Sequence, residues 1–246
     1  MSVDPWLPYW RPAPQARVRL ICFPYAGGGA SVFERWRADF PREIEICGVQ
    51  LPGREGRLTE RCFTRMDPLA DRLADILSRY SDAPLAFFGH SLGALIAWET
   101  ARRLAGHGSL LKHLFVSGQR APHLPGDGRM THLWPDAEFK DELRRLNGTP
   151  GDLLENEELM QLVLPLLRAD IGISESYVEQ KREKLTCPIS AFGALEDDVP
   201  PEQLTAWAEC TTNRFQLRMM AGDHFYFRAS RQPLTGAIIA DLRSQE

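Results

Sequence analysis

A serine between two glycines is the short motif of this chain that most clearly points to chemistry. The motif, Gly89-His90-Ser91-Leu92-Gly93, lies between the apolar run PLAFF and the amphipathic run LGALIAWETARRL. A Gly-x-Ser-x-Gly sequence at a sharp strand-to-helix turn lifts the serine hydroxyl clear of a sheet. Glycines flank the serine because side chains there would collide with the neighbouring strand and helix. The motif therefore predicts that Ser91 is a nucleophile.

A serine hydroxyl is a weak nucleophile unless a base removes its proton and an acid orients that base. In a strand-turn-helix arrangement the chain order is serine, acid, histidine. Of the six histidines, His224 in MMAGDHFYF follows the last strand-like run and is the predicted base, whereas His90 is expected to point away from the serine. The acid should follow the preceding strand-like run, and Glu196, Asp197 and Asp198 come directly after that run. We favour Asp197, with Asp198 as the second choice.

Acyl transfer by such a serine also needs hydrogen-bond donors for the tetrahedral oxyanion. The backbone amide of Leu92, directly after the serine, is expected to be the first donor. The loop CFPYAGGGAS follows the first strand-like run and offers the second donor, from Ala26 or alternatively from Tyr25. The glycines of this loop do not indicate a nucleotide site, because the pattern Gly-x-x-x-x-Gly-Lys-Ser/Thr is absent.

The elements that must position these residues follow a simple alternation. Short apolar runs rich in β-forming residues occur at 18–26, 44–53, 84–91, 111–118, 187–195 and 215–222. Helix-like segments lie between or after them, at about 31–40, 67–80, 92–106, 201–211 and 230–243. This alternation predicts an α/β fold with a parallel sheet that helices cover on both faces.

One interval, from about 129 to 184, has no strand-like run, and we interpret it as a helical insertion in a single domain spanning 1–246. We expect Asp136 to cap its first helix, Gly148 to end that helix, and Pro165 to kink a second one. The apolar face of the second helix either lines an acyl pocket or packs against the sheet. That face includes Leu159, Leu162, Leu166 and Ile171.

Composition excludes several classes of protein. The formal net charge of -4, without a long basic run, argues against a nucleic-acid partner. No apolar run is long enough to span a membrane, and the N-terminus lacks the pattern of a signal peptide, so we expect a cytoplasmic protein. The five scattered cysteines suggest neither disulfides nor a zinc site. Cys22, Cys47 and Cys187 are expected to be buried.

Six stretches together resemble the type II thioesterases that accompany nonribosomal peptide and polyketide synthases, a branch of the α/β-hydrolase superfamily. They are FPYAGGGAS, QLPGRE, FFGHSLGALIAWE, LFVSGQRAPH, LPLLRAD and AGDHFYF, in this order. The serine motif alone indicates only the superfamily, whereas PYAGG, LPGRE and LRAD narrow the resemblance to these thioesterases.

The resemblance implies an α/β-hydrolase fold in which the helical insertion is a mobile lid. It implies hydrolysis of acyl or aminoacyl groups from the phosphopantetheine arm of an acyl or peptidyl carrier protein, in an editing role. Ser91, Asp197 and His224 match the family's catalytic triad. The resemblance also implies a monomer that needs no metal and no cofactor of its own. Two other functions stay open: an esterase or lipase acting on free oxygen esters, and a catalytically silent module that binds carrier proteins.

Two residues depart from the family's usual pattern, and one cluster has two interpretations. Tyr25 stands where the family often has histidine, and Asp223 stands where the family often has glycine. Asp223 is next to His224 and could raise the basicity of this histidine.

A cluster of basic residues either is merely solvated or faces an acidic carrier protein. It consists of Arg54, Arg57, Arg61 and Arg65.

Overall fold

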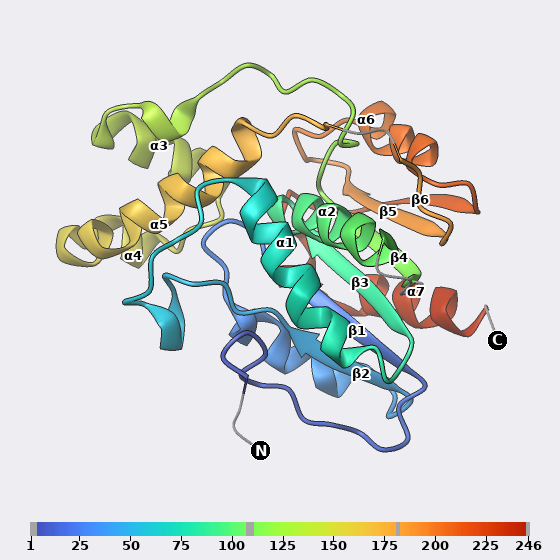
Figure 1. Cartoon of the computed structure of the whole chain (residues 1–246). Coiled ribbons are helices and arrows are strands. Elements are labelled where there is room, and N and C mark those ends of the chain that lie inside the picture. The colour runs from blue at the N-terminus through green and yellow to red at the C-terminus, as the bar shows by residue number, and fades with distance from the viewer. Residues whose placement is uncertain (1–3, 107–110, 181–182, 245–246) are drawn as a thin grey trace.

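The computed structural model describes residues 4–106, 111–180 and 183–244, and these contain one six-stranded parallel sheet (Figure 1). The strand order is β2-β1-β3-β4-β5-β6. The strands are β1 (Val18–Phe23), β2 (Ile44–Gly48), β3 (Leu85–His90), β4 (Leu111–Ser117), β5 (Ile189–Ala194) and β6 (Phe215–Met220). All six lie within the strand-like runs of the sequence, so the predicted parallel sheet is confirmed.

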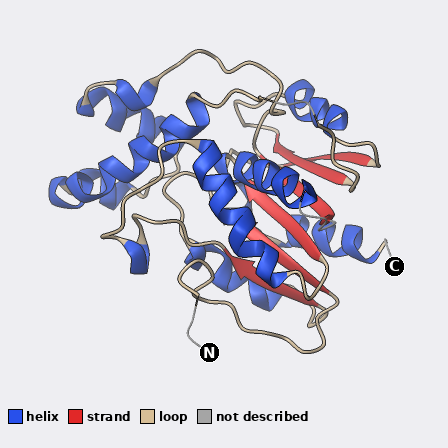
Figure 2. Ribbon diagram, viewed as in Figure 1, coloured by secondary structure: helices blue, strands red, loops and turns tan. Residues whose placement is uncertain are grey.

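Helices cover both faces of this sheet (Figure 2). Because successive side chains of a strand point to opposite faces, Leu20 and Cys22 of β1 enter one apolar cluster, while Ile21 and Phe23 enter the other. One face packs against α1 (Met66–Leu77) and α2 (Leu92–Gly106). The other packs against the 3-10 helix Ala30–Asp39 and α7 (Gln232–Arg243). The strands β1, β2, β3 and β5 are buried on both sides, which explains why their runs are largely apolar.

The predicted helical insertion lies between β4 and β5 and is set to one side of the sheet (Figure 1). It comprises the 3-10 helix Thr131–Leu133, α3 (Asp136–Leu146), α4 (Gly151–Glu155) and α5 (Glu157–Glu175), and is called the lid below. The lid has an apolar cluster of its own, to which Phe139, Leu143, Met160 and Leu164 belong. After β5 follow α6 (Pro201–Thr205) and the 3-10 helix Ala206–Cys210.

The ends of the lid helices differ from the prediction. Pro135 is the N-cap of α3, and the carboxylate of Asp136 instead accepts a hydrogen bond from Arg168 in α5, at 2.6 Å. Asn147, with φ 53°, ends α3 one residue before Gly148, because asparagine tolerates the left-handed conformation that a helix end requires. The α5 helix runs through Pro165 without interruption.

Cys22, Cys47 and Cys187 are buried, as expected, and their thiols are free. None of the helices that the structure describes is long and apolar enough to cross a membrane.

Candidate active site

The turn between β3 and α2 consists of a single residue, Ser91, whose φ of 54° is left-handed. A non-glycine residue in this region costs about 1–2 kcal/mol, so the turn is strained. A Cβ on Gly89 would lie 2.1 Å from the carbonyl oxygen of Gly93, and one on Gly93 would lie 2.2 Å from that of Phe23. Both glycines are therefore required by close backbone contacts, and the predicted strand-turn-helix geometry around Ser91 is confirmed.

The structure brings His224 together with one of the three candidate acids. His224 Nδ1 lies 2.8 Å from Asp197 Oδ2, and the Asp197 side chain is only 3% exposed. Asp198 turns to solvent with a side chain that is 77% exposed, and it pairs with Arg145 of the lid. Glu196 is exposed as well. The hydrogen bond of Nδ1 to Asp197 fixes the tautomer that leaves the other ring nitrogen of His224 available as a base.

One cavity of about 210 Å³ connects the predicted groups. Its lining includes Ser91 and His224, and also Ala26 and Leu92, the two residues expected to donate to the oxyanion. Neither of these two amides donates a hydrogen bond to any residue that the structure describes. Tyr25, the alternative donor, lines the same cavity. A nucleophile, a histidine and unpaired backbone donors therefore share one site, which is the arrangement that acyl transfer needs.

Comparison with known proteins identifies the family. A model described as "Thioesterase domain" matches residues 18–245. The chain belongs to the thioesterase domain family. It is 43% identical to the gramicidin S biosynthesis protein GrsT of Aneurinibacillus migulanus, over 93% of this chain and 90% of that protein. It is 41% identical to a Brevibacillus parabrevis protein named linear gramicidin dehydrogenase LgrE, over 99% of this chain and 95% of that protein.

Solved structures agree with this assignment. The type II thioesterase BorB from the borrelidin biosynthetic cluster superposes with a TM-score of 0.89 at 37% identity, over 98% of this chain and 99% of that chain. The fold of this thioesterase is thus the α/β-hydrolase fold that the motifs predicted.

The lid residues proposed for the acyl pocket are only partly in place. Ile171 lines the cavity, and Leu166 is buried without lining it. Leu159 and Leu162 are 45% and 61% exposed and lie outside the lining, so both alternatives considered for them, pocket and packing, were wrong. The inward stripe of α5 instead contains Met160, Leu164, Leu167 and Ile171, and Leu167 lines the cavity. Their spacing of four, three and four residues is helical, but Leu159, Leu162 and Leu166 also have helical spacing, so spacing alone did not distinguish the two stripes.

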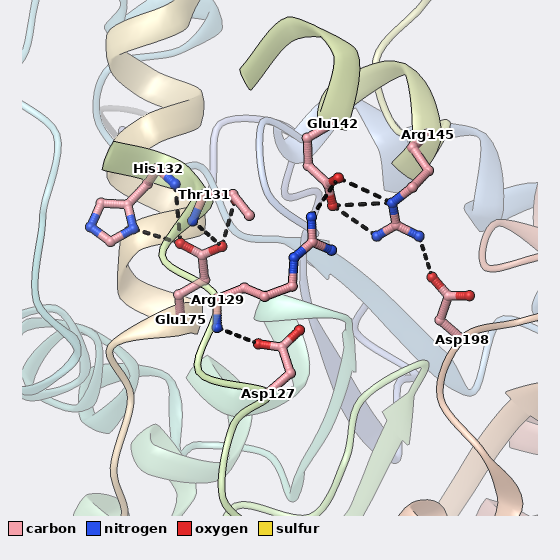
Figure 3. Close-up of polar contacts among 8 residues, drawn as sticks. All are labelled: Asp127, Arg129, Thr131, His132, Glu142, Arg145, Glu175 and Asp198. Atoms are coloured by element: carbon pink, nitrogen blue, oxygen red, sulfur yellow. Dashed lines mark hydrogen bonds and ion pairs between the residues drawn. The ribbon is translucent and has the colours of Figure 1, made fainter. Parts of the chain in front are cut away.

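The thioesterase also has a charged cavity wall that the sequence did not indicate (Figure 3). Glu142 of α3 accepts hydrogen bonds from Arg129 and Arg145, each at 2.8 Å. The hydrogen bond from Arg145, outweighing burial, lowers the pKa of Glu142 and keeps its carboxylate ionised. Arg145 also reaches Asp198, so it connects the lid to the loop that carries the acid.

A second carboxylate of this wall is held by the start of the lid. Glu175, at the end of α5, accepts hydrogen bonds from the Thr131 amide at 2.9 Å and the His132 amide at 3.1 Å, and it contacts His132 Nδ1 (Figure 3). The two ends of the lid are thereby joined beside the cavity.

Across the residues that the structure describes, no group of three or more His, Cys, Asp or Glu side chains could hold a metal ion.

The ring of His90 lies against the site. Period-two alternation puts His90 on the same sheet face as Phe88, which the segment 225–227 covers, and its ring centroid is 4.6 Å from that of His224. His90 Nδ1 lies 2.9 Å from Ser117 Oγ. Burial lowers the pKa of His90 well below its usual value, and His224 adds to this shift, so His90 is neutral.

Two of the four arginines in the expected basic cluster are buried, so the prediction of an exposed patch was wrong for them. Arg57 is buried and pairs with Glu60, and Arg54 is buried and pairs with Asp170 of the lid. Arg61 and Arg65 are exposed.

The two departures from the family pattern also contact nearby groups. Tyr25 packs edge-on against Phe225. The Asp223 carboxylate accepts hydrogen bonds from Asn147 Nδ2 at 3.1 Å and from the amide of Phe225 at 2.9 Å. Asp223 therefore joins the histidine loop to the end of α3, and its effect on the basicity of His224 stays a prediction.

Proposed function

We propose that this thioesterase hydrolyses acyl or aminoacyl thioesters from the phosphopantetheine arm of a carrier protein, as an editing enzyme of nonribosomal peptide or polyketide synthesis. The observation that carries the proposal is the strained Ser91 in one cavity with His224, whose ring is hydrogen-bonded to Asp197. The relatives support the pathway, because their names refer to gramicidin S and borrelidin biosynthesis. The proposed reaction needs no metal or cofactor of the enzyme's own, since phosphopantetheine belongs to the substrate.

In the proposed mechanism, His224 Nε2 takes the proton of Ser91 Oγ as this oxygen attacks the thioester carbonyl. The amides of Ala26 and Leu92 donate to the oxyanion of the tetrahedral intermediate. The intermediate collapses when the carbon-sulfur bond breaks, and the phosphopantetheine thiol leaves with the proton from His224. A water molecule, deprotonated by the same imidazole, then hydrolyses the acyl-serine and regenerates the enzyme.

The test uses a carrier protein loaded with a panel of acyl and aminoacyl groups, and intact-protein mass spectrometry to follow their release. Ser91→Ala is expected to lower kcat at least about a thousandfold, because it removes the nucleophile of a triad. Ser78→Ala is the matched control, since this half-buried serine donates its hydroxyl proton to the Asp75 carbonyl. Near-native turnover by Ser91→Ala would end this mechanism.

The same panel separates the proposal from its two alternatives. Matched free thioesters and free oxygen esters are tested beside the loaded carriers. A preference for oxygen esters with no release from any carrier would favour an esterase. Carrier binding without hydrolysis of any substrate would favour the non-catalytic module, for which a paired histidine and acid beside a strained serine have no use.

The name of LgrE raises hydride transfer as a further function, and the loop after β1 argues against it here. Dinucleotide-binding folds place a pyrophosphate at this loop, before the N-terminus of an α-helix. In this chain a 3-10 helix follows β1. A Cβ on Gly29 would lie 2.1 Å from Glu55 Oε1, so a carboxylate occupies the space in front of the loop. Its negative charge would repel a pyrophosphate.

A further inference from the structure

Asp170 of α5 has a buried carboxylate that is hydrogen-bonded to a loop of the catalytic site. It is 1% exposed and accepts three hydrogen bonds. Two come from Arg54, through Nη1 at 2.7 Å and Nη2 at 2.9 Å. The third comes from the backbone amide of Gly27, at 2.8 Å. Asp170 thus holds the residue next to Ala26, the expected oxyanion donor.

Arg54 holds the same loop from a second side. Its Nη1 also donates to the carbonyl oxygen of Gly28, at 3.1 Å. Its own carbonyl accepts a hydrogen bond from Gln50 Nε2 at 3.0 Å, and Gln50 Oε1 accepts one from the Ala30 amide at 2.9 Å. The guanidinium is therefore fixed by backbone contacts as well as by its counter-ion.

The segment that these contacts hold is a tight turn around the oxyanion amide. The Gly28 amide donates to the Tyr25 carbonyl at 2.9 Å, and Gly27 has φ +79°, which is the pattern of a type II turn. The Tyr25 carbonyl and the Ala26 amide belong to the same peptide group. The direction of the Ala26 N–H therefore depends on this turn, whose amide at Gly27 and carbonyl at Gly28 are bound by the ion pair.

The lid helix leaves this turn little freedom. A Cβ on Gly27 would lie 2.6 Å from Leu167 Cδ2, so α5 packs directly on the turn.

A buried ion pair is weak evidence for stability, because removing both charges from water costs as much free energy as their attraction returns. Its two hydrogen bonds to one short turn, from the Gly27 amide and to the Gly28 carbonyl, instead indicate a role in positioning that turn.

We propose that Asp170 and Arg54 are positioning residues that orient the Ala26 amide toward the oxyanion. The inference rests on the proposed acyl transfer at Ser91. It also explains why the stretches LPGRE and LRAD occur together, because they contain Arg54 and Asp170, the two partners of one ion pair. Loss of one oxyanion donor lowers kcat by about 10²–10³, and a donor that is merely misaligned loses part of that.

The first variant is Asp170→Asn in the full chain. We expect kcat to fall about 10- to 100-fold, because a misplaced donor loses part of the factor that a missing one costs. KM is expected to change less than about threefold, since the ground-state carbonyl depends less on this donor. The affinity for an alkylboronic acid, whose serine adduct is tetrahedral, should fall in parallel with kcat/KM. The pH profile of kcat/KM should not shift, because His224 and Asp197 are untouched.

Glu45→Gln is the matched control, because it makes the same chemical change in the buried ion pair of Glu45 with Arg19, near the other end of β1. It should leave kcat and boronic acid affinity near native. The double variant Arg54→Met with Asp170→Leu removes both charges, so no unpaired charge opposes folding, and it should show the same loss of kcat. Native kcat and boronic acid affinity in either Asp170 variant, or an equal loss in Glu45→Gln, would overturn the proposal.

The two proposals fail in different ways. If the native enzyme releases nothing from any carrier, the proposed substrate is wrong. The Asp170 variants can then still be judged on free esters, because the oxyanion forms there as well.

Discussion

The two neighbouring carboxylates after β5 allow a sharp test of the site, by comparing Asp197→Asn with Asp198→Asn. Each change replaces one carboxylate oxygen by an amide nitrogen and leaves the size of the side chain nearly unchanged. Asp197 Oδ2 is 2.8 Å from His224 Nδ1 and its side chain is almost fully buried, whereas Asp198 pairs with Arg145 at the surface. The same chemical change should therefore have very different effects one residue apart.

The magnitudes follow from these contacts. An asparagine beside Nδ1 favours the wrong tautomer of His224, which lowers kcat by about 10⁴, equivalent to roughly 5 kcal/mol of transition-state stabilisation. The Asp198 and Arg145 side chains are 77% and 47% exposed, and ion pairs of that kind contribute about 0–1 kcal/mol. Asp198→Asn should therefore keep kcat within about threefold of native, because no contact with the imidazole is lost.

The assay is steady-state hydrolysis of one carrier-bound thioester by the two variants and the native enzyme. Urea unfolding of each protein is the control, and we expect the same fraction folded in all three. If Asp198→Asn lost as much activity as Asp197→Asn, the imidazole would be oriented by the other carboxylate, and the reasoning from the 2.8 Å hydrogen bond would be refuted.

Two further predictions concern two buried residues, Gly118 beside His224 and His113 in β4. Gly118→Ala is expected to lower kcat about a hundredfold, as misplacement of a catalytic group by about 1 Å does. Its Cβ would lie 2.7 Å from His90 Cε1 and 3.0 Å from His224 Cε1, and native kcat in the variant would contradict this. The unfolding free energy should fall as pH drops from 6.5 toward 4, because burial lowers the pKa of His113 to about 4 and the unfolded chain binds that proton first. His113 accounts for at most about 3 kcal/mol of this loss, so urea unfolding of His113→Gln should show a flatter pH dependence, and an unchanged slope would refute the assignment.

Local patterns in the sequence were sufficient for the sheet and for the turn that carries Ser91. Strands buried on both faces are largely apolar, so β1 and β3 were visible as runs without any knowledge of their partners. The serine turn was visible because its geometry needs glycines at fixed positions. The pairing of His224 with the acid loop was also within reach, since parallel strands bring the loops at their carboxyl ends to one edge of the sheet.

Features that depend on contacts between distant residues could not be predicted from local patterns. The spacing of the four arginines suggested a solvated patch, but Asp170, 116 residues from Arg54, draws Arg54 into the interior. In α5, Leu162 and Leu167 are equally apolar, and only the position of the helix over the cavity decides that Leu162 faces solvent. The sequence contains the helix, but the direction of its apolar stripe is set by tertiary packing.

The contacts of the lid with the catalytic loops are energetically unequal, which bears on the mobility that the family resemblance implies and that stays a prediction. Near α3, the Arg145 contact with Asp198 and the Asn147 contact with Asp223 involve exposed side chains. Contacts of this kind contribute about 0–1 kcal/mol and break at little cost. In α5, by contrast, separation of Asp170 from Arg54 would leave two buried charges without their counter-ions, a loss of about 3–5 kcal/mol. If the lid opened at α3, the turn that contains Ala26 would therefore stay intact, whereas displacement of α5 would release it.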